Sequence, residues 1–474
     1  MDIHMRRLQT FILAFFFVLA GCSSHVQHLP KIEPGANIFP PLEERSSLLV
    51  GIALSGGGSR AAYFGAAGIE ALSHLRTGPS TPSILEQVSY ISSVSGGSVA
   101  SSYFVTHKPD AEVHALSADG SLTPQYRDFF DKYLTAMSAN YQRSLELRQF
   151  FNIRWFNSNQ RATSLAETLS SAFLGERTFE DLYEREKKRN SPRLILNATL
   201  YNNGRRVVMT TVPSEDFKYD FIPRLQQELK TNRPLPESLE RAKVALLPVT
   251  LKDEEADPRQ IPLAYAVTAS ASFPFFIGPI TVQVAGKESY LHVGDGGLFD
   301  NQGTESLVEL FLKKLADKKA KRALVIAFDS SFPFWVKNDA LDRMKNGFDI
   351  FVKDSGRIIG IMEQRANAYQ AMVWHILQSE RKVLPDDTII KVLVLRHTDD
   401  AWLPQQAWQS AIPDSCDKSE FKERDSVRQH MALIPTLFKI ESECDRALLR
   451  AAAQGLVQNK RKEITDFLEK PSDM

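Results

Sequence analysis

The chain has 474 residues, of which 43% are hydrophobic and 24% are charged, and its 57 basic residues balance its 57 acidic residues. This composition is that of a folded globular protein, and the length exceeds one typical domain, although α/β enzymes often form a single unit of this size. Because there is no basic excess, the composition argues against binding to nucleic acid, or to any anionic surface, by charge alone.

The N-terminus has the pattern of a secretory signal. Arg6 and Arg7 precede an uncharged apolar run, Phe11–Ala20, which ends in small residues. This run is shorter than the roughly 20 apolar residues that cross a bilayer as a helix. A basic start, a short apolar core and small residues at its end describe a cleaved signal peptide. We therefore predict a signal peptide over residues 1–21.

Cys22 directly follows the predicted cleavage position. Residues 19–22, Leu-Ala-Gly-Cys, resemble the lipobox of bacterial lipoproteins, in which the cysteine is lipidated and becomes the first residue. Several acyl chains on one residue hold a protein firmly on a membrane. The resemblance implies a lipid-anchored protein of the bacterial cell envelope, on the periplasmic side, with residues 22–46 as a tether; Ser23 favours the outer membrane. The alternative is an ordinary signal peptide with a chance cysteine.

Two further cysteines, Cys416 and Cys444, lie toward the C-terminus. In an oxidising periplasm they could form a disulfide. Two free buried thiols are the alternative, because the sequence does not reveal the geometry that a disulfide needs.

Two strand–glycine–helix units follow the tether. Ser47–Leu54 is a continuous apolar run that ends at three glycines, and Arg60–Leu75 has the pattern of a helix rich in small residues. Val88–Val94 is a second predicted strand, and a second helix of small residues starts at Gly96. Two such units close together predict an α/β fold with a parallel sheet and a site at the carboxyl ends of its strands.

Residues 111–190 form a predicted helical insertion. Aromatic residues recur there at three- and four-residue spacing, as on one face of a helix. These are Tyr126, Phe129, Phe130, Tyr133 and Tyr141, followed by a cluster of Phe150, Phe151, Trp155 and Phe156. The simpler interpretation is that the rings belong to the core; the alternative is a lid, or a wall for an acyl chain, over the site.

The remaining elements complete the sheet and cover it. Arg193–Tyr201 and Arg206–Thr211 form a predicted strand pair around an Asn-Asn-Gly turn. Leu263–Ser272 is small and alternating and ends at a turn crowded by Pro274 and aromatic residues, and Arg322–Phe328 and Ile389–Leu395 are further buried strands. We expect residues 47–330 to form the main domain, and residues 331–474 to form a mostly helical region packed on it.

The three consecutive glycines, Gly56, Gly57 and Gly58, are the first chemical signal. Glycine allows backbone angles that turn N–H groups toward a ligand, and such a loop before a helix binds a phosphate or an oxyanion. The Lys-Ser/Thr of a P-loop is absent, but this motif alone leaves a nucleotide site and a structural turn open. Arg60 is a cation in the first helical turn, where the helix dipole disfavours it. It therefore indicates an anionic partner, either a carboxylate of the protein or a lipid head group.

Ser95 lies where a predicted strand meets a predicted helix, in the sequence Ser-Val-Ser-Gly-Gly of residues 93–97. A nucleophilic serine at such a turn needs small residues two positions away on either side, because the turn is tight and crowded. Gly97 meets this need, whereas Ser93 is small but is not glycine. Ser93 and Ser98 are competing hydroxyls, and Ser95 is favoured because it lies at the strand end directly before two glycines.

Asp295 lies in the sequence Val-Gly-Asp-Gly-Gly of residues 293–297. Flanking glycines, including Gly296 and Gly297, hold a carboxylate in a tight and exposed backbone position from which it can reach another side chain. Taken alone, an aspartate in a turn is the simpler interpretation.

The three motifs, in this order, resemble those of the patatin-like phospholipase family over residues 48 to about 303. Residues 56–61 look like its oxyanion-hole motif, with Ala61 where many members have glycine. Residues 93–97 look like its nucleophile motif, with Ser93 as a departure, and residues 295–297 look like its Asp-Gly-Gly/Ala motif. The form Ser-Gly-Gly-Gly-x-Arg-Ala is also similar to the cytosolic phospholipase A group.

This resemblance implies a three-layer α/β/α fold and a Ser95–Asp295 dyad that hydrolyses lipid acyl esters without histidine, metal or cofactor. The glycine N–H groups would bind the oxyanion, and Asp295 would act as the base from a partly dry cleft that raises its pKa. The implied partners are a phospholipid or lysophospholipid substrate and a membrane, with no nucleic acid; the oligomeric state stays open.

Two other functions stay open at this point. One is a Ser-His-Asp hydrolase, whose base would be one of four histidines, none of them in a glycine-rich loop: His292, His375, His397 and His430. The other is a catalytically silent, lipid-binding envelope lipoprotein on the same fold, although the presence of both Ser95 and Asp295 argues against it. No cluster of histidine and cysteine has the spacing of metal ligands, so metal catalysis has little support.

Overall fold

The structure is a computed structural model that describes residues 26–44, 46–151, 158–219, 237–274, 277–331, 353–379 and 388–469. The predicted signal peptide, Cys22, and the aromatic residues Trp155 and Phe156 lie outside the described residues. Within the described ranges, no helix combines the length and apolar character that crossing a bilayer requires.

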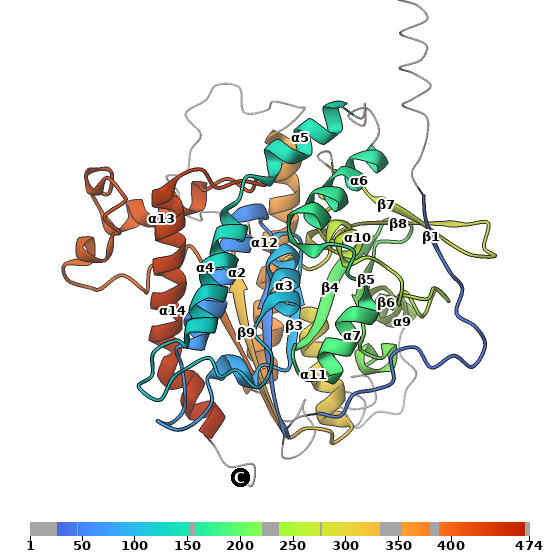
Figure 1. The fold of residues 1–474 in the computed structure, drawn as a ribbon, viewed down its shortest axis with the longest axis horizontal. Helices are drawn as coiled ribbons and strands as arrows, with labels where there is room; N and C mark the ends of the chain where they lie inside the picture. The colour runs from blue at the N-terminus through green and yellow to red at the C-terminus, as the bar shows by residue number, and fades with distance from the viewer. Residues whose placement is uncertain are drawn as a thin grey trace, which may run out of the picture.

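One sheet at the centre contains the ten strands of the described residues (Figure 1). They are β1 (Val26–Leu29), β2 (Leu48–Leu54), β3 (Tyr90–Ser93), β4 (Arg193–Leu200), β5 (Arg205–Thr210), β6 (Val249–Thr250), β7 (Ile280–Val284), β8 (Tyr290–Asp295), β9 (Arg322–Asp329) and β10 (Ile389–Arg396). Hydrogen-bonded neighbours follow the path β1-β7-β8-β4-β3-β2-β9-β10, and β5, which also pairs with β4, pairs in turn with β6. From β4 to β10 all neighbours on this path are parallel, whereas β8 is antiparallel to β4 and β7. The predicted mostly parallel sheet is confirmed.

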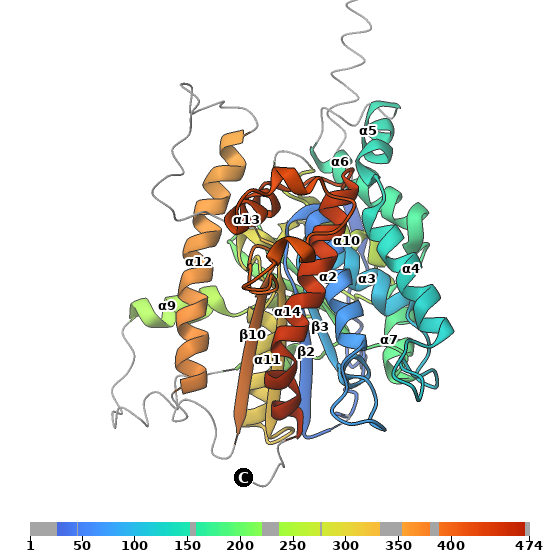
Figure 2. The same ribbon diagram turned by 90° about the vertical axis from the view of Figure 1, so that its left-hand side faces the viewer.

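Helices cover both faces of this sheet, as Figure 2 shows from the side. One face carries α2 (Gly58–Ser73), α3 (Gly96–His107), α4 (Pro124–Ser138) and α14 (Glu443–Glu469), and the other carries α11 (Glu305–Ala316) and α12 (Lys353–Ser379). Further helices are α5 (Tyr141–Phe151), α6 (Ser158–Leu169), α7 (Phe179–Lys187), α9 (Glu237–Leu246), α10 (Leu263–Ser270) and α13 (Arg424–Leu433). The expected three-layer α/β/α architecture is therefore confirmed.

The central strands are apolar on both sides because helices bury both faces. In β2, Ile52 and Leu54 pack in the core beneath α2, and Leu49 and Ala53 pack in the core beneath α11. The small residues of α2 allow it to lie close to the sheet. A Cβ at Gly68 would lie 2.2 Å from a ring carbon of Phe328, so the helix could not keep this position with a larger residue.

The small and alternating segment 263–272 contains a helix, α10, over Leu263–Ser270. Pro262 precedes the helix with φ −63°, a value that is already compatible with a helical start. Ala264 and Ala266 are buried, as are most of the other residues of α10. A short helix that is buried nearly all round has no polar face, so its sequence lacks the 3.6-residue period that would distinguish it from a strand.

The insertion aromatics on α4 belong to the core. Tyr126, Phe129, Phe130 and Tyr133 are each at most 5% exposed. The Tyr133 hydroxyl donates to the carbonyl of Ala100 on α3 at 2.8 Å. Phe150 on α5, by contrast, is 74% exposed. The expectation that the aromatic rings belong to the core therefore holds for α4 but not for Phe150.

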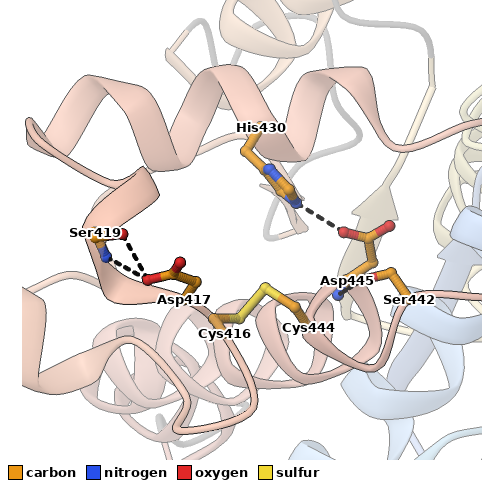
Figure 3. The surroundings of a disulfide bond; sticks show 7 residues. All are labelled: Cys416, Asp417, Ser419, His430, Ser442, Cys444 and Asp445. Carbon is orange, nitrogen blue, oxygen red and sulfur yellow. Dashed lines mark hydrogen bonds and ion pairs between the residues drawn. A yellow bond between two sulfur atoms is a disulfide. The ribbon is translucent and has the colours of Figure 1, made fainter.

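The C-terminal region contributes a strand to the sheet and packs against α2. Its strand β10 pairs with β9 along the whole of both strands, and α14 packs against α2, where Arg450 forms an ion pair with Glu70. Cys416 and Cys444 form a disulfide with an S–S distance of 2.02 Å (Figure 3). The disulfide joins the loop after β10 to the start of α14.

Candidate active site

Ser95 sits at the turn between β3 and α3 with backbone angles φ 51° and ψ −119°. A residue with a Cβ rarely adopts such angles, and residues that do so cluster at functional sites, where the surrounding structure holds the strain. The two glycines that follow permit the close packing of this turn. A Cβ at Gly96 would lie 1.9 Å from the carbonyl oxygen of Gly58, and one at Gly97 would lie 2.4 Å from that of Leu54. Ser95 itself is half-buried, at the N-terminus of α3.

A network of buried hydroxyl groups lies behind Ser95. The Ser95 N–H donates to Ser270 Oγ at 3.1 Å, and Ser270 Oγ is 2.8 Å from Ser98 Oγ. Ser93 Oγ is 2.7 Å from Ser101 Oγ. The competing hydroxyls of Ser93 and Ser98 are thus fully buried and engaged with other serines, whereas Ser95 is the member of the motif that is partly accessible.

The pairing of β4 brings the ends of β3 and β8 together. Ser93, the last residue of β3, pairs with position 196 of β4, and Asp295, the last residue of β8, pairs with position 198. Both strands lie on the same edge of β4, because β5 pairs with the other edge over positions 195–200. Since β3 and β8 run in opposite directions, their carboxyl ends face each other across Asn197. Asn197 Nδ2 donates to the carbonyl of Ser93 at 3.0 Å.

Asp295 is a buried carboxyl group whose two oxygens have different surroundings. Its side chain is 2% exposed, and Oδ1 accepts a hydrogen bond of 2.7 Å from the N–H of Gly297. The Ser95 side chain interacts with the carboxylate, but Oδ2 is enclosed and has no well-formed partner among the described residues. Burial raises the pKa of Asp295 to about 7, although the Gly297 N–H and the Ser95 hydroxyl lower it. A carboxylate in this environment can accept a proton near neutral pH.

The three glycines of the loop before α2, Gly56 to Gly58, do not play the same part. Gly57 and Gly58 have φ 133° and 60°, and neither N–H has a hydrogen-bond partner within the described part of the chain. The N–H of Gly56 instead donates to the carbonyl of Asn301 at 2.9 Å. Gly57 and Gly58 can therefore donate to an oxyanion, whereas Gly56, expected to share that role, is already engaged.

Arg60 is fully buried and directed into the protein. Its guanidinium donates to the carbonyl oxygens of Ser330 and Ile434 at 2.8 and 2.7 Å, and to Ser330 Oγ at 3.2 Å. Burial lowers its pKa to about 10, although the carboxyl groups of Glu363 and Asp329 raise it. Within the described residues these hydrogen bonds go to neutral oxygens and not to a carboxylate, one of the two partners expected for Arg60; Glu363 and Asp329 act on it only through their charge. The side chain joins the start of α2, the end of β9 and the C-terminal region.

Asn301 is a residue of the site that the three motifs did not reveal; in the sequence, Asp300-Asn301 has only the composition of a turn. Its carbonyl accepts from Gly56, and its Oδ1 lies 2.1 Å from where a Cβ of Gly56 would be and 2.6 Å from where one of Gly297 would be. The side chain is thus wedged between the glycine loop and the loop that follows Asp295. Without the two glycines, it could not occupy this place.

The four histidines considered as the base of a Ser-His-Asp triad lie elsewhere or contact other residues. His292 Nδ1 is 3.0 Å from Thr281 Oγ1, and His430 Nε2 is 2.7 Å from Asp445 Oδ1, as Figure 3 shows. His397 is buried with Nδ1 3.4 Å from the carbonyl of Asp329. His375 is exposed on α12. No hydrogen bond between a histidine and Ser95 or Asp295 is present in the described ranges.

No group of three potential metal ligands occurs among the residues that the structure describes.

Residues 52–308 match the model of the patatin-like phospholipase family. The match covers more than half of the chain and contains the glycine loop, Ser95 and Asp295. The chain therefore belongs to the patatin-like phospholipase family. A comparison with curated proteins found no match.

Several solved structures are similar to this chain. One is human GIVD cytosolic phospholipase A2, with 13% sequence identity and a TM-score of 0.44, over 90% of this chain and 60% of the human chain. Another is VipD from Legionella pneumophila, with 12% identity and a TM-score of 0.32, over 94% of this chain and 72% of VipD. The chain thus spans 60% of the length of the human enzyme.

Proposed function

We propose that the protein is a serine acyl hydrolase that cleaves the acyl esters of phospholipids or lysophospholipids through a Ser95–Asp295 dyad. One observation carries the proposal: a half-buried serine in a strained turn interacts with a buried carboxylate whose pKa is raised to about 7. Membership of the patatin-like phospholipase family supports the lipid ester as the substrate class.

The first step forms an acyl-enzyme. Asp295 accepts the proton of the Ser95 hydroxyl as Oγ attacks the ester carbonyl. The carbonyl oxygen becomes an oxyanion, for which the unengaged N–H groups of Gly57 and Gly58 are the donors. When the tetrahedral intermediate collapses, the C–O bond to the leaving alcohol breaks, and Asp295 returns its proton to that alcohol.

The second step releases the fatty acid. Asp295 takes a proton from water, the resulting hydroxide attacks the acyl carbonyl, and the proton returns to Ser95 Oγ as the C–O bond to serine breaks. The same two glycine N–H groups stabilise the second oxyanion. Removing one donor of this kind typically slows a hydrolase by about 100- to 1,000-fold.

We further propose that a lipidated Cys22 tethers the enzyme to a membrane, on the periplasmic side of a bacterial envelope and more specifically on the outer membrane. The support is the sequence of residues 1–22. Such an anchor would keep a lipid hydrolase at the surface that contains its substrate. Cys22→Ser should move the protein from the membrane fraction to the soluble fraction, and a variant that still sediments with membranes would contradict the tether.

Labelling with a fluorophosphonate tests the dyad directly. The probe should form a bond from Ser95 Oγ to phosphorus with loss of fluoride, and peptide mass spectrometry should place the label on Ser95. Ser95→Ala should be unlabelled, and Asp295→Asn should be labelled far more slowly. Replacement of His375, His397 or His430 should leave labelling unchanged. A large loss at one histidine would indicate a Ser-His-Asp triad, and no label on Ser95 in the wild type would favour a lipid-binding protein.

A further inference from the structure

Residues 26–44, most of the predicted tether, run along the body of the protein, and we call them the N-terminal strap. Figure 1 shows the strap in dark blue, leading from β1 down one side of the molecule to the lower end of the sheet. The N–H of Asp257 donates to the carbonyl of Pro30, and the Tyr183 hydroxyl donates to that of Pro40, each at 2.8 Å. Three apolar side chains of the strap are buried in the core: Leu29, Ile38 and Phe39. The strap is therefore bound along its length and is not a free spacer.

A cluster of ion pairs fixes the end of the strap that leads into β2. Glu44 Oε1 lies 2.7 Å from Arg193 Nη1 and 2.7 Å from Lys314 Nζ, and the three side chains are 10%, 12% and 4% exposed. Separating such a pair would leave a buried charge without its partner. Arg193 is the first residue of β4, so the cluster lies at the sheet end opposite Ser95. The other end of the strap is fixed by β1, which pairs in parallel with β7 over its whole length.

The register of the sheet places the start of the strap close to Asp295. Val26 of β1 pairs with Thr281 of β7, and Thr281 pairs with His292 of β8. Adjacent strands lie about 4.8 Å apart, so Val26 is about 10 Å from His292 across the sheet. Asp295 follows His292 on the same strand, about 10 Å further along it. The start of the strap is therefore within about 20 Å of the proposed base.

Cys22, the residue proposed to carry the lipid, comes four positions before Val26. Four chain steps span at most about 14 Å, so a lipid on Cys22 would be attached within about 35 Å of the Asp295 backbone. Without a bound strap, the chain from Cys22 would first meet the sheet at Leu48, where β2 begins. The spacer would then be up to about 90 Å long, and it would join the sheet at the end away from the site.

We propose that the strap holds the Ser95–Asp295 site close to the membrane that carries the lipid anchor, so that the enzyme hydrolyses lipids of that same membrane. The bound strap reduces the free arm to the few residues before β1 and attaches it beside the site. The effective concentration of a tethered group falls as its linker lengthens, so a short arm favours lipid in the anchoring membrane. This inference rests on the proposed function, because it needs both the lipid on Cys22 and the dyad.

Two insertions of equal length test this role in the full lipidated protein. A segment of about 40 Gly and Ser residues behaves as a flexible coil. Placed between Ser24 and His25, it precedes the strap and lengthens the free arm. Placed between Arg45 and Ser46, it follows the strap. There it adds the same length between Cys22 and β2 but leaves the free arm unchanged, and closing a longer surface loop costs little stability.

The first measurement is hydrolysis of a fluorogenic phospholipid in the phosphatidylcholine vesicles that carry the protein. The insertion before the strap should lower the initial rate at least about tenfold, because an arm about 11 times longer reduces the effective concentration by about 30-fold. The insertion after the strap should stay within about twofold of the wild type. In mixed detergent micelles, where the anchor does not set the distance to the substrate, all three proteins should be equally active.

A fluorescent fluorophosphonate gives a second measurement that needs no lipid turnover. It forms a bond from Ser95 Oγ to phosphorus with loss of fluoride, and energy transfer from the labelled serine to acceptor lipids then reports how close the site is to the membrane. The insertion before the strap should reduce this transfer by at least about half, because its flexible arm has a root-mean-square length of about 36 Å. The insertion after the strap should leave the transfer unchanged.

Equal effects of the two insertions would overturn the inference, because the strap would then not hold the arm. Unchanged transfer and hydrolysis after the first insertion would also overturn it, since the site would then meet the membrane through another surface. Labelling at the wild-type rate shows that a variant is folded, and the insertion before the strap, which precedes every described element, carries the test if the other fails to fold. A wild type that does not bind vesicles overturns the lipid anchor together with this inference, whereas one without label on Ser95 overturns the dyad.

Discussion

Asp295→Asn should make the protein more stable above neutral pH, although it removes the proposed base. In the unfolded chain the Asp295 carboxyl group ionises near pH 3.8, whereas burial in the folded protein raises its pKa to about 7. Between these values the folded state holds a proton that the unfolded state has released, so the free energy of unfolding decreases as the pH rises. Below pH 3.8 both states are protonated, and well above pH 7 both are ionised.

The two pKa values determine the size of the effect. The difference between 3.8 and about 7 corresponds to about 4 kcal/mol of stability lost on going from acid to alkaline pH. The carboxyl group is 2% exposed, so solvent does little to screen this cost. Asparagine has no proton to lose and keeps an oxygen for the N–H of Gly297. The advantage of the variant should therefore grow by about 3 kcal/mol between about pH 5 and about pH 8.

Urea unfolding of the wild type and the variant at these two pH values measures the effect. Asp216→Asn is a control whose effect should not change between these two pH values. Although burial raises the pKa of Asp216, Lys314 and Lys319 together hold it below its usual value of 3.8, so this carboxyl group is ionised in both the folded and the unfolded state from about pH 5 to about pH 8. This variant should therefore be less stable than the wild type by the same amount at both pH values. If the difference between wild type and Asp295→Asn is the same at both pH values, Asp295 ionises normally and is not the base inferred from its burial.

Three further outcomes follow from the backbone geometry and from the disulfide. Ser95→Gly and Ser95→Ala should both be inactive in ester hydrolysis. The glycine variant should be about 1 kcal/mol more stable than the alanine variant by urea unfolding, because glycine adopts φ 51° without strain. Equal stability of the two variants would contradict strain at this turn. Gly97→Ala should abolish fluorophosphonate labelling of Ser95, because the added Cβ would lie 2.4 Å from the carbonyl oxygen of Leu54. Gly65→Ala should still be labelled, because its Cβ would meet only a methyl group of Leu54, at 3.1 Å. If both variants are labelled equally, the close packing at Gly97 is contradicted. Reduction of the Cys416–Cys444 disulfide, which closes a separation of 28 residues, should lower the free energy of unfolding by about 3–4 kcal/mol, and an unchanged denaturation midpoint under reducing conditions would argue against it.

The parts of the site that could be predicted from sequence are those determined by near neighbours in the chain. An apolar run followed by glycines and a small-residue helix specifies a strand, a tight turn and a helix start. This is why β2, α2, β3 and α3 were expected within a few residues of their observed bounds. The same local patterns singled out Ser95 and Asp295 and indicated a parallel α/β sheet. Local periodicity failed at α10, where burial on all sides removed the period that distinguishes a helix from a strand.

Contacts between distant segments could not be predicted in this way. The sequence indicated an anionic partner for Arg60, but only the fold shows that the guanidinium is fully buried and bound to carbonyl groups of Ser330 and Ile434. Nor could the sequence show that the N–H of Gly56 donates to the carbonyl of Asn301.

By itself, the sequence determined which residues can carry the chemistry: a serine at a strand end, a carboxylate between glycines, and a loop able to present N–H groups. Their meeting was decided by tertiary structure, because β3 and β8 face each other only once both have paired with the same edge of β4. The raised pKa of Asp295 has the same origin, since a carboxyl group becomes hard to ionise only when the packed chain has removed the water around it. Turn geometry is set by residues within a few positions of each other. Burial and charge at the site depend on segments from every part of the described chain.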